Sequence, residues 1–76
     1  MNVGDFLRPS FALDSAGIEK MKRYPIEEIS ESYIYVRTGF SLLFPIAKTK
    51  IVEEERFMED VEENYRSRTW LHTQAV

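Results

Sequence analysis

Short runs in which apolar and polar residues alternate fill the middle of the chain, from Tyr24 to Glu53. In the clearest run, Tyr33 to Thr38, the apolar residues Ile34 and Val36 alternate with aromatic and polar ones. β-Branched and aromatic residues at a period of two are typical of a strand with one buried face. We therefore expect Ile34 and Val36 to face the core. The opposite face would carry Tyr33, Tyr35 and Arg37.

Prolines and glycines divide the rest of this region into further short strands. Thr38-Gly39 permits a tight reversal, after which Phe40, Leu42 and Phe44 alternate with other residues until Pro45 ends the run. We expect about five short strands before residue 53. Besides Tyr33 to Thr38 they would cover Val3 to Arg8, stopped by Pro9, then Pro25 to Ser30, Phe40 to Phe44 and, after a helical turn at Ile46 to Lys48, Thr49 to Val52.

Residues 14–23 are compatible with two local structures. Asp14 and Ser15 can cap a helix of one or two turns, but Gly17 weakens such a helix and Pro25 prevents its extension. A long ordered loop is the equal alternative.

The period of the pattern changes at Glu53. Phe57, Val61 and Tyr65 recur every four residues, and acidic side chains fill most of the positions between them. This spacing predicts an amphipathic α-helix over residues 53–70, of about four turns. Acids early in this segment and Arg66 and Arg68 near its end suit the helix macrodipole.

Length and composition restrict the class of protein. A chain of 76 residues has room for a single domain 1–76, made of residues 1–52 and the helix. It buries about 60% of the surface that its unfolded form exposes, which leaves little room for a deep substrate cavity. Without cysteine, the small core must be supplemented by packing or self-association, so we expect strand or helix pairing in a homodimer. Neither a signal peptide nor an apolar run of membrane-spanning length is recognisable, so we expect a cytoplasmic protein without membrane contact.

Charge is distributed unevenly along the chain. The formal net charge is −3, and residues 53–76 hold seven acidic residues against three arginines. Nucleic-acid binding usually depends on a basic field, so it is disfavoured here.

The chemistry-bearing residues do not form a catalytic pattern. His72 is the only histidine and has no partner at metal-ligand or triad spacing, so we assign it no role, and we expect no enzyme activity, no metal and no cofactor. The acidic side chains of the predicted helix are interpreted first as a solvated face. The functional alternative is that Glu55, Glu59 and Glu62 mimic phosphates and occupy a basic groove on another protein.

Two groups of residues are candidates for partner contacts. Tyr33, Tyr35 and Arg37 could form an exposed patch, because Tyr and Arg are favoured at interface centres, or they could pack under the helix. Trp70 and Leu71 are either a lock that pins the helix or an exposed anchor for another chain.

Taken together, several segments resemble the SH3-like small-barrel superfamily. They are the opening Val3 to Arg8, the central Ile26 to Val36, the proline-marked Leu43 to Ala47, and Lys50 to Val52. The resemblance covers about residues 2–53. It implies a mainly β fold of the β+α type, a five-stranded SH3-like barrel with a C-terminal α-helix, and a last strand that returns beside the first.

Three families with this barrel differ from the chain in informative ways. Plasmid-borne dihydrofolate reductases carry Gln and Tyr where this chain has Leu42, Leu43 and Phe44. KOW-type modules carry a basic Gly-rich loop where this chain has Asp14 to Gly17. Signalling SH3 domains need a tryptophan in the barrel body, whereas Trp70 is expected beyond the helix.

We therefore expect a non-enzymatic protein-interaction module. It would be a small regulator or inhibitor, of a kind common in phage genomes, that occupies a partner protein's surface. The alternative is a KOW-like nucleic-acid-associated module of transcription or translation, using Tyr35, Arg37 and nearby lysines.

Overall fold

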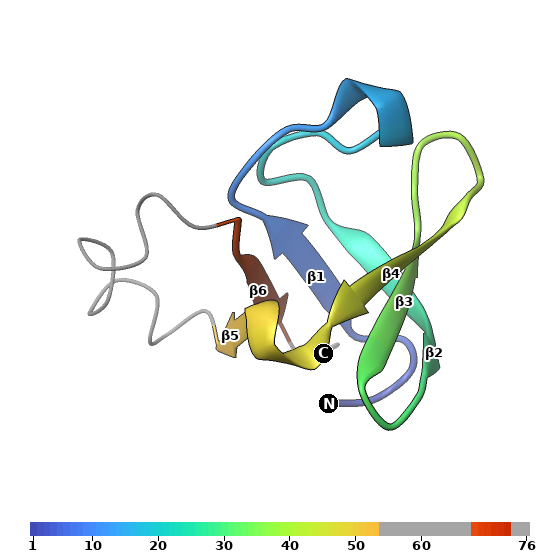
Figure 1. The fold of residues 1–76 in the computed structure, drawn as a ribbon, viewed down its shortest axis with the longest axis vertical. Helices are drawn as coiled ribbons and strands as arrows, with labels where there is room; N and C mark the ends of the chain where they lie inside the picture. Colours follow the sequence, from blue (N-terminus) through green and yellow to red (C-terminus); the bar gives the residue numbers. More distant parts are fainter. Residues whose placement is uncertain (54–67, 74–76) are drawn as a thin grey trace.

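A computed structural model describes residues 1–53 and 68–73, which form a small, mainly β domain (Figure 1). Two 3-10 turns, η1 (Asp14–Ala16) and η2 (Lys48–Lys50), are the helical elements of this part of the chain. No helix within the described residues is long and apolar enough to cross a membrane. The strands are β1 (Phe6–Pro9), β2 (Tyr24–Ile29), β3 (Tyr33–Arg37), β4 (Leu43–Ala47), β5 (Ile51–Glu53) and β6 (Trp70–Thr73).

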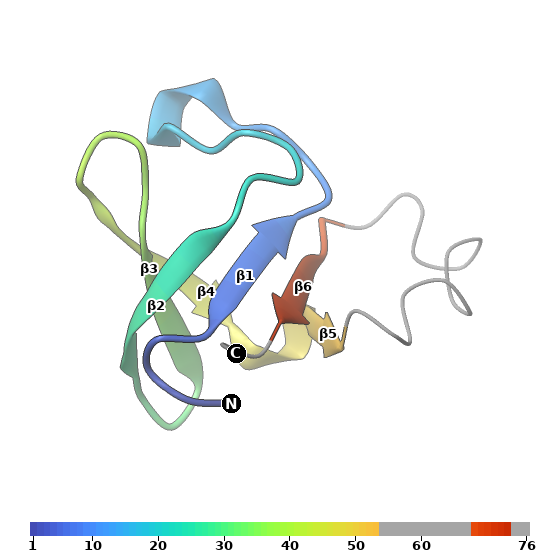
Figure 2. The same ribbon diagram turned by 180° about the vertical axis from the view of Figure 1, so that it is seen from behind.

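The strands form one six-stranded sheet in the order β4-β3-β2-β1-β6-β5. Strands β1 to β4 pair with their neighbours in sequence as antiparallel strands. The last strand, β6, lies between β1, to which it is antiparallel, and β5, to which it is parallel. Both ribbon views show this insertion (Figures 1 and 2). The strand that returns beside the first is therefore β6, whereas the sequence pattern predicted residues 50–52.

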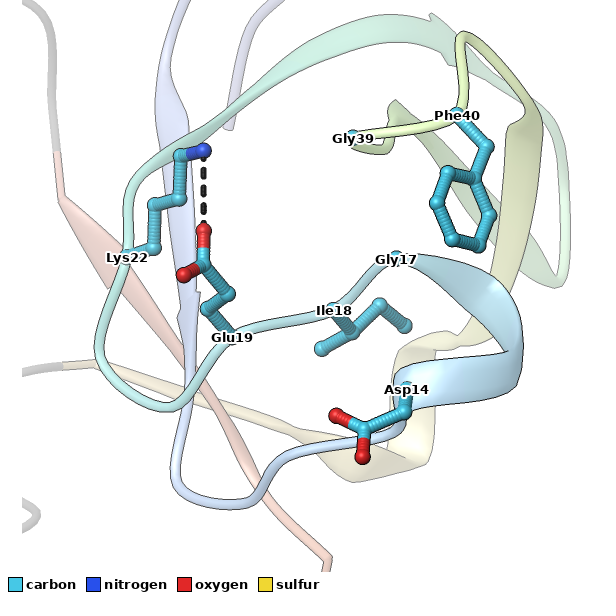
Figure 3. A pocket seen from close by; sticks show the side chains of 7 residues that line it. All are labelled: Asp14, Gly17, Ile18, Glu19, Lys22, Gly39 and Phe40. Atoms are coloured by element: carbon cyan, nitrogen blue, oxygen red, sulfur yellow. Dashed lines mark hydrogen bonds and ion pairs between the residues drawn. The ribbon is translucent and has the colours of Figure 1, made fainter.

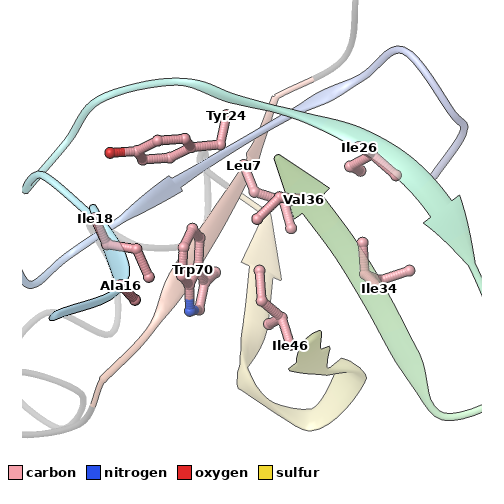
Figure 4. Close-up of a cluster of buried hydrophobic side chains, with 9 residues drawn as sticks. All are labelled: Leu7, Ala16, Ile18, Tyr24, Ile26, Ile34, Val36, Ile46 and Trp70. Carbon is pink, nitrogen blue, oxygen red and sulfur yellow. The ribbon is translucent and has the colours of Figure 1, made fainter. Parts of the chain in front are cut away.

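The sheet bends over one hydrophobic core, into which β1, β2, β3, β4 and β6 direct apolar side chains (Figure 4). Ile34 and Val36 are fully buried, as their alternation predicts, and pack in one cluster with Leu7 and Trp70. The cluster joins residues more than sixty positions apart in the sequence. Its members from the loop after β1 are Ala16 and Ile18.

The prediction of a C-terminal α-helix over residues 53–70 is wrong at both ends. Glu53 is the last residue of β5, and Trp70 is the first residue of β6. Trp70 is 3% exposed and contacts aromatic rings of the core. Its place in a strand is therefore determined by burial in the core and not by the four-residue period of the preceding segment. Residues 54–67 lie outside the described part of the chain. The described chain thus has six strands, one more than expected, and no α-helix.

Two turns also differ from their predicted positions. Pro45 lies inside β4 rather than at its end, and the helical turn follows at Lys48–Lys50. A proline is tolerated there because β4 is the outermost strand of the sheet, where a missing N–H interrupts no ladder. Phe40 and Leu42 belong to the tip between β3 and β4, where they are 60% and 51% exposed.

The segment between β1 and β2 is an ordered loop with one 3-10 turn. Gly17 ends this turn with φ +70°, and its carbonyl accepts a hydrogen bond from the Gly39 N–H at 3.1 Å. The Tyr24 hydroxyl donates to the same carbonyl at 3.2 Å. The first bond holds the loop against the β3–β4 tip, and the second ties it to the start of β2.

Candidate functional site

An open groove lies along the outer edge of β4, the edge that faces away from β3. Four consecutive residues of β4, Phe44 to Ala47, line one side of it. The groove encloses about 210 Å³. We call it the β4 groove. Its other lining residues are Phe11 and Leu13 from the loop after β1, Lys50 from η2, and Arg68 and Trp70 at the start of β6.

Aromatic packing forms the floor of the β4 groove. The Trp70 ring meets the Phe11 ring edge-to-face, with centroids 5.5 Å apart and an interplanar angle of 88°. It also lies 6.1 Å from the Phe44 ring. Because Trp70 is 3% exposed while Phe11 and Phe44 are half-buried, a ligand would meet mainly the two phenylalanines.

Two cationic side chains line the same groove. The Arg68 guanidinium lies over the Phe11 ring, 5.3 Å from its centroid. Lys50 is exposed at the end of η2, which directly follows β4. The pairing of Ile51 with Trp70 brings the start of β6 beside the residue after η2. Both cations therefore lie toward the C-terminal end of β4.

The backbone of β4 presents hydrogen-bonding groups at its outer edge. The bonds Thr38 N to Leu42 O (2.9 Å) and Lys48 N to Ser32 O (3.0 Å) mark the hydrogen-bonded pairs of the β3–β4 ladder. Such pairs alternate with non-bonded pairs, in which the backbone N–H and C=O groups of each residue point away from the partner strand. The non-bonded pairs are Arg37 with Leu43, Tyr35 with Pro45, and Tyr33 with Ala47.

The available groups at this edge are few. Pro45 has no N–H, and the Ala47 carbonyl begins the 3-10 turn, so its hydrogen bond belongs to η2. Beside the groove this leaves the Pro45 carbonyl and the Ala47 N–H. Among the described strands, β4 pairs only with β3.

The predicted contact residues do not form one site, although Tyr33, Tyr35 and Arg37 share the outer face of β3. Tyr33 is 46% exposed on the outer face of β3, and Arg37 on the same face bonds to the Ser41 carbonyl (2.9 Å) and to Glu27 (3.3 Å). Trp70 and Leu71 are 3% and 1% exposed within β6, which excludes the exposed-anchor alternative. Tyr35 shares the β3 face and is half-buried. Glu55, Glu59 and Glu62 lie outside the described residues.

His72, to which the sequence analysis assigned no role, is the centre of a charged cluster in which His72 and Asp5 are buried and Glu53 is half exposed. Its Nε2 lies 2.8 Å from Asp5 Oδ2, and its Nδ1 lies 2.8 Å from Glu53 Oε2. Asp5 and Glu53 are 67 and 19 positions away, so no local motif could have revealed the cluster. Both ring nitrogens are engaged, which leaves neither to act as a base.

Electrostatics favours the charged form of His72. Burial disfavours an imidazolium, but the hydrogen bonds to Asp5 and Glu53 outweigh it and raise the pKa of His72 above its ordinary 6.5. Within residues 1–53 and 68–73, no group of three His, Asp or Glu side chains is arranged to hold a metal ion. We interpret the cluster as a tie between β6, β5 and the residue before β1.

A second hollow lies between the loop after β1 and the β3–β4 tip (Figure 3). It encloses about 440 Å³ and is lined by Asp14, Glu19, Lys22 and Phe40, among others. The Glu19 and Lys22 side chains pair with each other at 3.0 Å. Charges of both signs therefore face this hollow, and they select no class of ligand.

The β4 groove and the His72 cluster are interpreted from their own contacts. No protein-family model, no curated protein and no solved structure matches the chain.

Proposed function

We propose that this domain is a non-enzymatic protein-interaction module that binds an extended segment of a partner protein in the β4 groove. The segment carries an apolar residue followed or preceded by acidic ones. The observation that supports this function is the combination, in one open groove, of an aromatic floor, a strand edge and two cations.

Each part of the groove contributes a different term to binding. Burial of an apolar side chain against Phe11 and Phe44 supplies about 25 cal/mol per Å² of apolar surface removed from water. The edge of β4 supplies main-chain hydrogen bonds, as in other domains that bind peptides by strand addition. Lys50 and Arg68 select negative charge by electrostatic complementarity.

The resemblance to SH3-like barrels supports the same class of function. In those barrels the peptide-binding surface includes a tryptophan in the barrel body. Trp70 lines the β4 groove but is 3% exposed, so the half-buried Phe11 and Phe44 would take the place of that tryptophan here. The contribution of Glu55, Glu59 and Glu62 to partner binding stays a prediction.

The alternative of nucleic-acid binding also has an observation in its favour, because aromatic rings beside cations can stack bases. Two features count against it. The guanidinium of Arg68 lies over the Phe11 ring, and the Trp70 ring is almost fully buried. These two features leave the Phe44 ring as the main surface on which a base could stack, so nucleic-acid binding is one outcome of the test.

The test is an NMR titration of the isotope-labelled full chain with three probes. They are the acidic peptide acetyl-Gly-Ser-Thr-Val-Leu-Glu-Glu-Gly-amide, the same peptide with lysine in place of glutamate, and a short single-stranded oligothymidylate. We expect the acidic peptide to shift amides of β4 and η2, and the other two probes to bind at least about tenfold more weakly. Tighter, salt-sensitive binding of the oligonucleotide would instead establish the nucleic-acid alternative.

Two lysines of η2 provide a matched pair of variants. Lys50 lines the groove, whereas Lys48 is exposed on the same turn and does not. Lys50→Glu should weaken binding of the acidic peptide about tenfold, by reversing one charge contact. Lys48→Glu makes the same change in net charge and should leave the affinity within about twofold. If both variants lose affinity for the acidic peptide equally, the effect is due to net charge alone, and the groove is rejected as the binding site.

A further inference from the structure

We infer that the outer edge of β4 also binds a second copy of this chain, in a two-fold symmetric dimer in which Pro45 of each copy lies opposite Ala47 of the other. This inference goes beyond the proposed function, because it names a different occupant of the β4 groove. The observation that carries it is the match between the backbone groups that this edge offers and the groups that it lacks.

Two-fold symmetry determines the direction of the paired strands. In a parallel ladder, a residue that bonds across the pair lies opposite one whose groups point away. A two-fold axis along the strands would place each residue beside its own copy, so it permits no parallel ladder. An axis across the strands makes them antiparallel. With this axis at Ile46, whose backbone groups point toward β3, Pro45 lies opposite Ala47 of the other copy.

The backbone groups of this pair are complementary. In an antiparallel hydrogen-bonded pair, each residue donates its N–H to the carbonyl of the other. The Ala47 N–H of one copy donates to the Pro45 carbonyl of the other, and the two-fold axis repeats this bond. The remaining bond of the pair would need a Pro45 N–H and a free Ala47 carbonyl. The missing donor thus faces an acceptor that is already engaged in η2.

A segment of another protein fits the same edge less well. Any residue opposite Pro45 directs its carbonyl at a proline nitrogen that has no hydrogen. In the symmetric pair this carbonyl belongs to Ala47, and η2 already satisfies it. A two-fold axis at Phe44 or at Pro45 would instead leave a carbonyl of Leu43 or of Pro45 facing a proline nitrogen. Because a polar group left unpaired at an interface lowers affinity, the edge is most complementary to itself about Ile46.

The side chains beside this edge suit the same arrangement. The strand Leu43–Ala47 holds no charged residue, whereas sheet edges that resist pairing commonly carry lysine. Residues before Ile46 in one copy face residues after it in the other, so Leu42 and Leu43 lie toward η2 of the other copy. They are 51% and 39% exposed, and their contact with a second copy removes apolar surface from water. The two Lys50 side chains lie toward opposite ends of the interface and do not oppose each other.

The substitution Ala47→Pro tests the hydrogen bond with little other change. Ala47 has φ −62° and ψ 134°, so proline fits its backbone, and its N–H makes no bond to β3. Ala47→Ser is the matched control, because it keeps the N–H. In sedimentation equilibrium of the full chain, we expect wild type and Ala47→Ser to dimerise. Ala47→Pro should raise the dissociation constant of the dimer at least about tenfold. An unchanged dissociation constant would overturn the inference.

NMR of a mixture of labelled and unlabelled chains locates the interface independently of any variant. Ile46 forms a non-bonded pair with its own copy across the axis, and the Cα atoms of such a pair are about 4.5 Å apart. We therefore expect a nuclear Overhauser effect between the Ile46 α-protons of the two copies. A dimer that lacks this contact would contradict the inference, even if Ala47→Pro weakens self-association.

The acidic peptide used for the proposed function separates the two proposals. It occupies the same groove, so we expect it to convert the dimer to monomer. If the chain is monomeric at about 1 mM but binds the peptide, self-pairing is wrong and the proposed function stands. If the chain dimerises about Ile46 and the peptide does not bind, the proposed function is rejected and this inference stands. A dimer that binds the peptide without dissociating would place the self-association elsewhere and overturn the inference.

Discussion

His72 Nε2 lies 2.8 Å from Asp5 Oδ2, and this contact joins the last described strand to the residue that precedes the first. Asp5 Oδ2 also accepts a hydrogen bond from the Asn2 N–H at 2.9 Å. On the other side of the imidazole, Glu53 binds Nδ1. Because a neutral ring has only one N–H, both bonds can be donated only by the imidazolium.

Stability should therefore fall at alkaline pH. The pKa of His72 is raised above 6.5 in the folded chain, so its contribution to stability is complete below that pH and is lost as the pH rises through the folded-state pKa. An NMR titration of the His72 ring protons, with urea unfolding on both sides of this range, measures both quantities. A pKa at or below 6.5 would contradict the charged bridge.

Removal of the carboxylate charge should lower the free energy of unfolding more at Asp5 than at Glu53. The Asp5 side chain is 8% exposed and the Glu53 side chain 49%. We expect Asp5→Asn to lower the free energy of unfolding by about 3 kcal/mol, because it breaks a buried pair. Glu53→Gln, in contact with solvent, should cost less than about 1 kcal/mol. Urea unfolding near neutral pH compares them, and equal losses would show that burial does not control the cluster.

Alanine substitutions at three glycines should separate backbone strain from close contact. Gly17 has φ +70°, and a Cβ there would lie 3.0 Å from the Phe40 nitrogen. Gly4 has φ +97° but nothing within 4 Å, and Gly39 has only the close contact, 3.0 Å from the Gly17 carbonyl oxygen. We expect Gly17→Ala to lower stability by about 2 to 3 kcal/mol and Gly4→Ala by about 1 kcal/mol. Thermal unfolding of Gly4→Ala, Gly39→Ala and Gly17→Ala provides the ranking, and a Gly17→Ala variant as stable as wild type would contradict the tight crossing of the two loops.

A chain that ends at Glu53 should not fold. It lacks β6, which pairs with both β1 and β5, and it lacks the Trp70 ring that packs on Phe11, Tyr24 and Phe44. Loss of a buried tryptophan side chain alone costs about 3 to 5 kcal/mol, a large part of the stability of a small domain. Amide dispersion in NMR spectra reports the outcome. A matched chain that ends at Thr73 keeps β6 and should stay folded; a folded chain ending at Glu53 would show that β6 is dispensable.

Local alternation was a reliable guide at β3. The segment around Ile34 and Val36 was assigned correctly because a period of two already separates a core face from an outer face. The limits of β4 were harder to predict, since Pro45 is tolerated only on an outermost strand. That position is a property of the whole sheet and not of the residues beside the proline.

That the domain binds a partner protein stays a prediction, and the residues of the candidate site were not predicted. A partner-binding domain without a catalytic pattern was expected, yet the residues that line the β4 groove include Phe11 and Arg68, which no motif had linked. They meet there because β6 returns between β1 and β5. The cluster of Asp5, His72 and Glu53 has the same origin.

From its sequence alone, this protein is determined to be a small domain built mainly of short strands, with the Ile34 and Val36 face inward, because side-chain alternation records burial locally. The place of residues 70–73 was decided only by the tertiary structure. A four-residue strand gains its stability from the neighbours with which it pairs, here β1 and β5, and those partners are separated from it by many residues of chain. Burial of Trp70 and the bridging of His72 are made possible by that pairing, so neither could be seen before the fold was known.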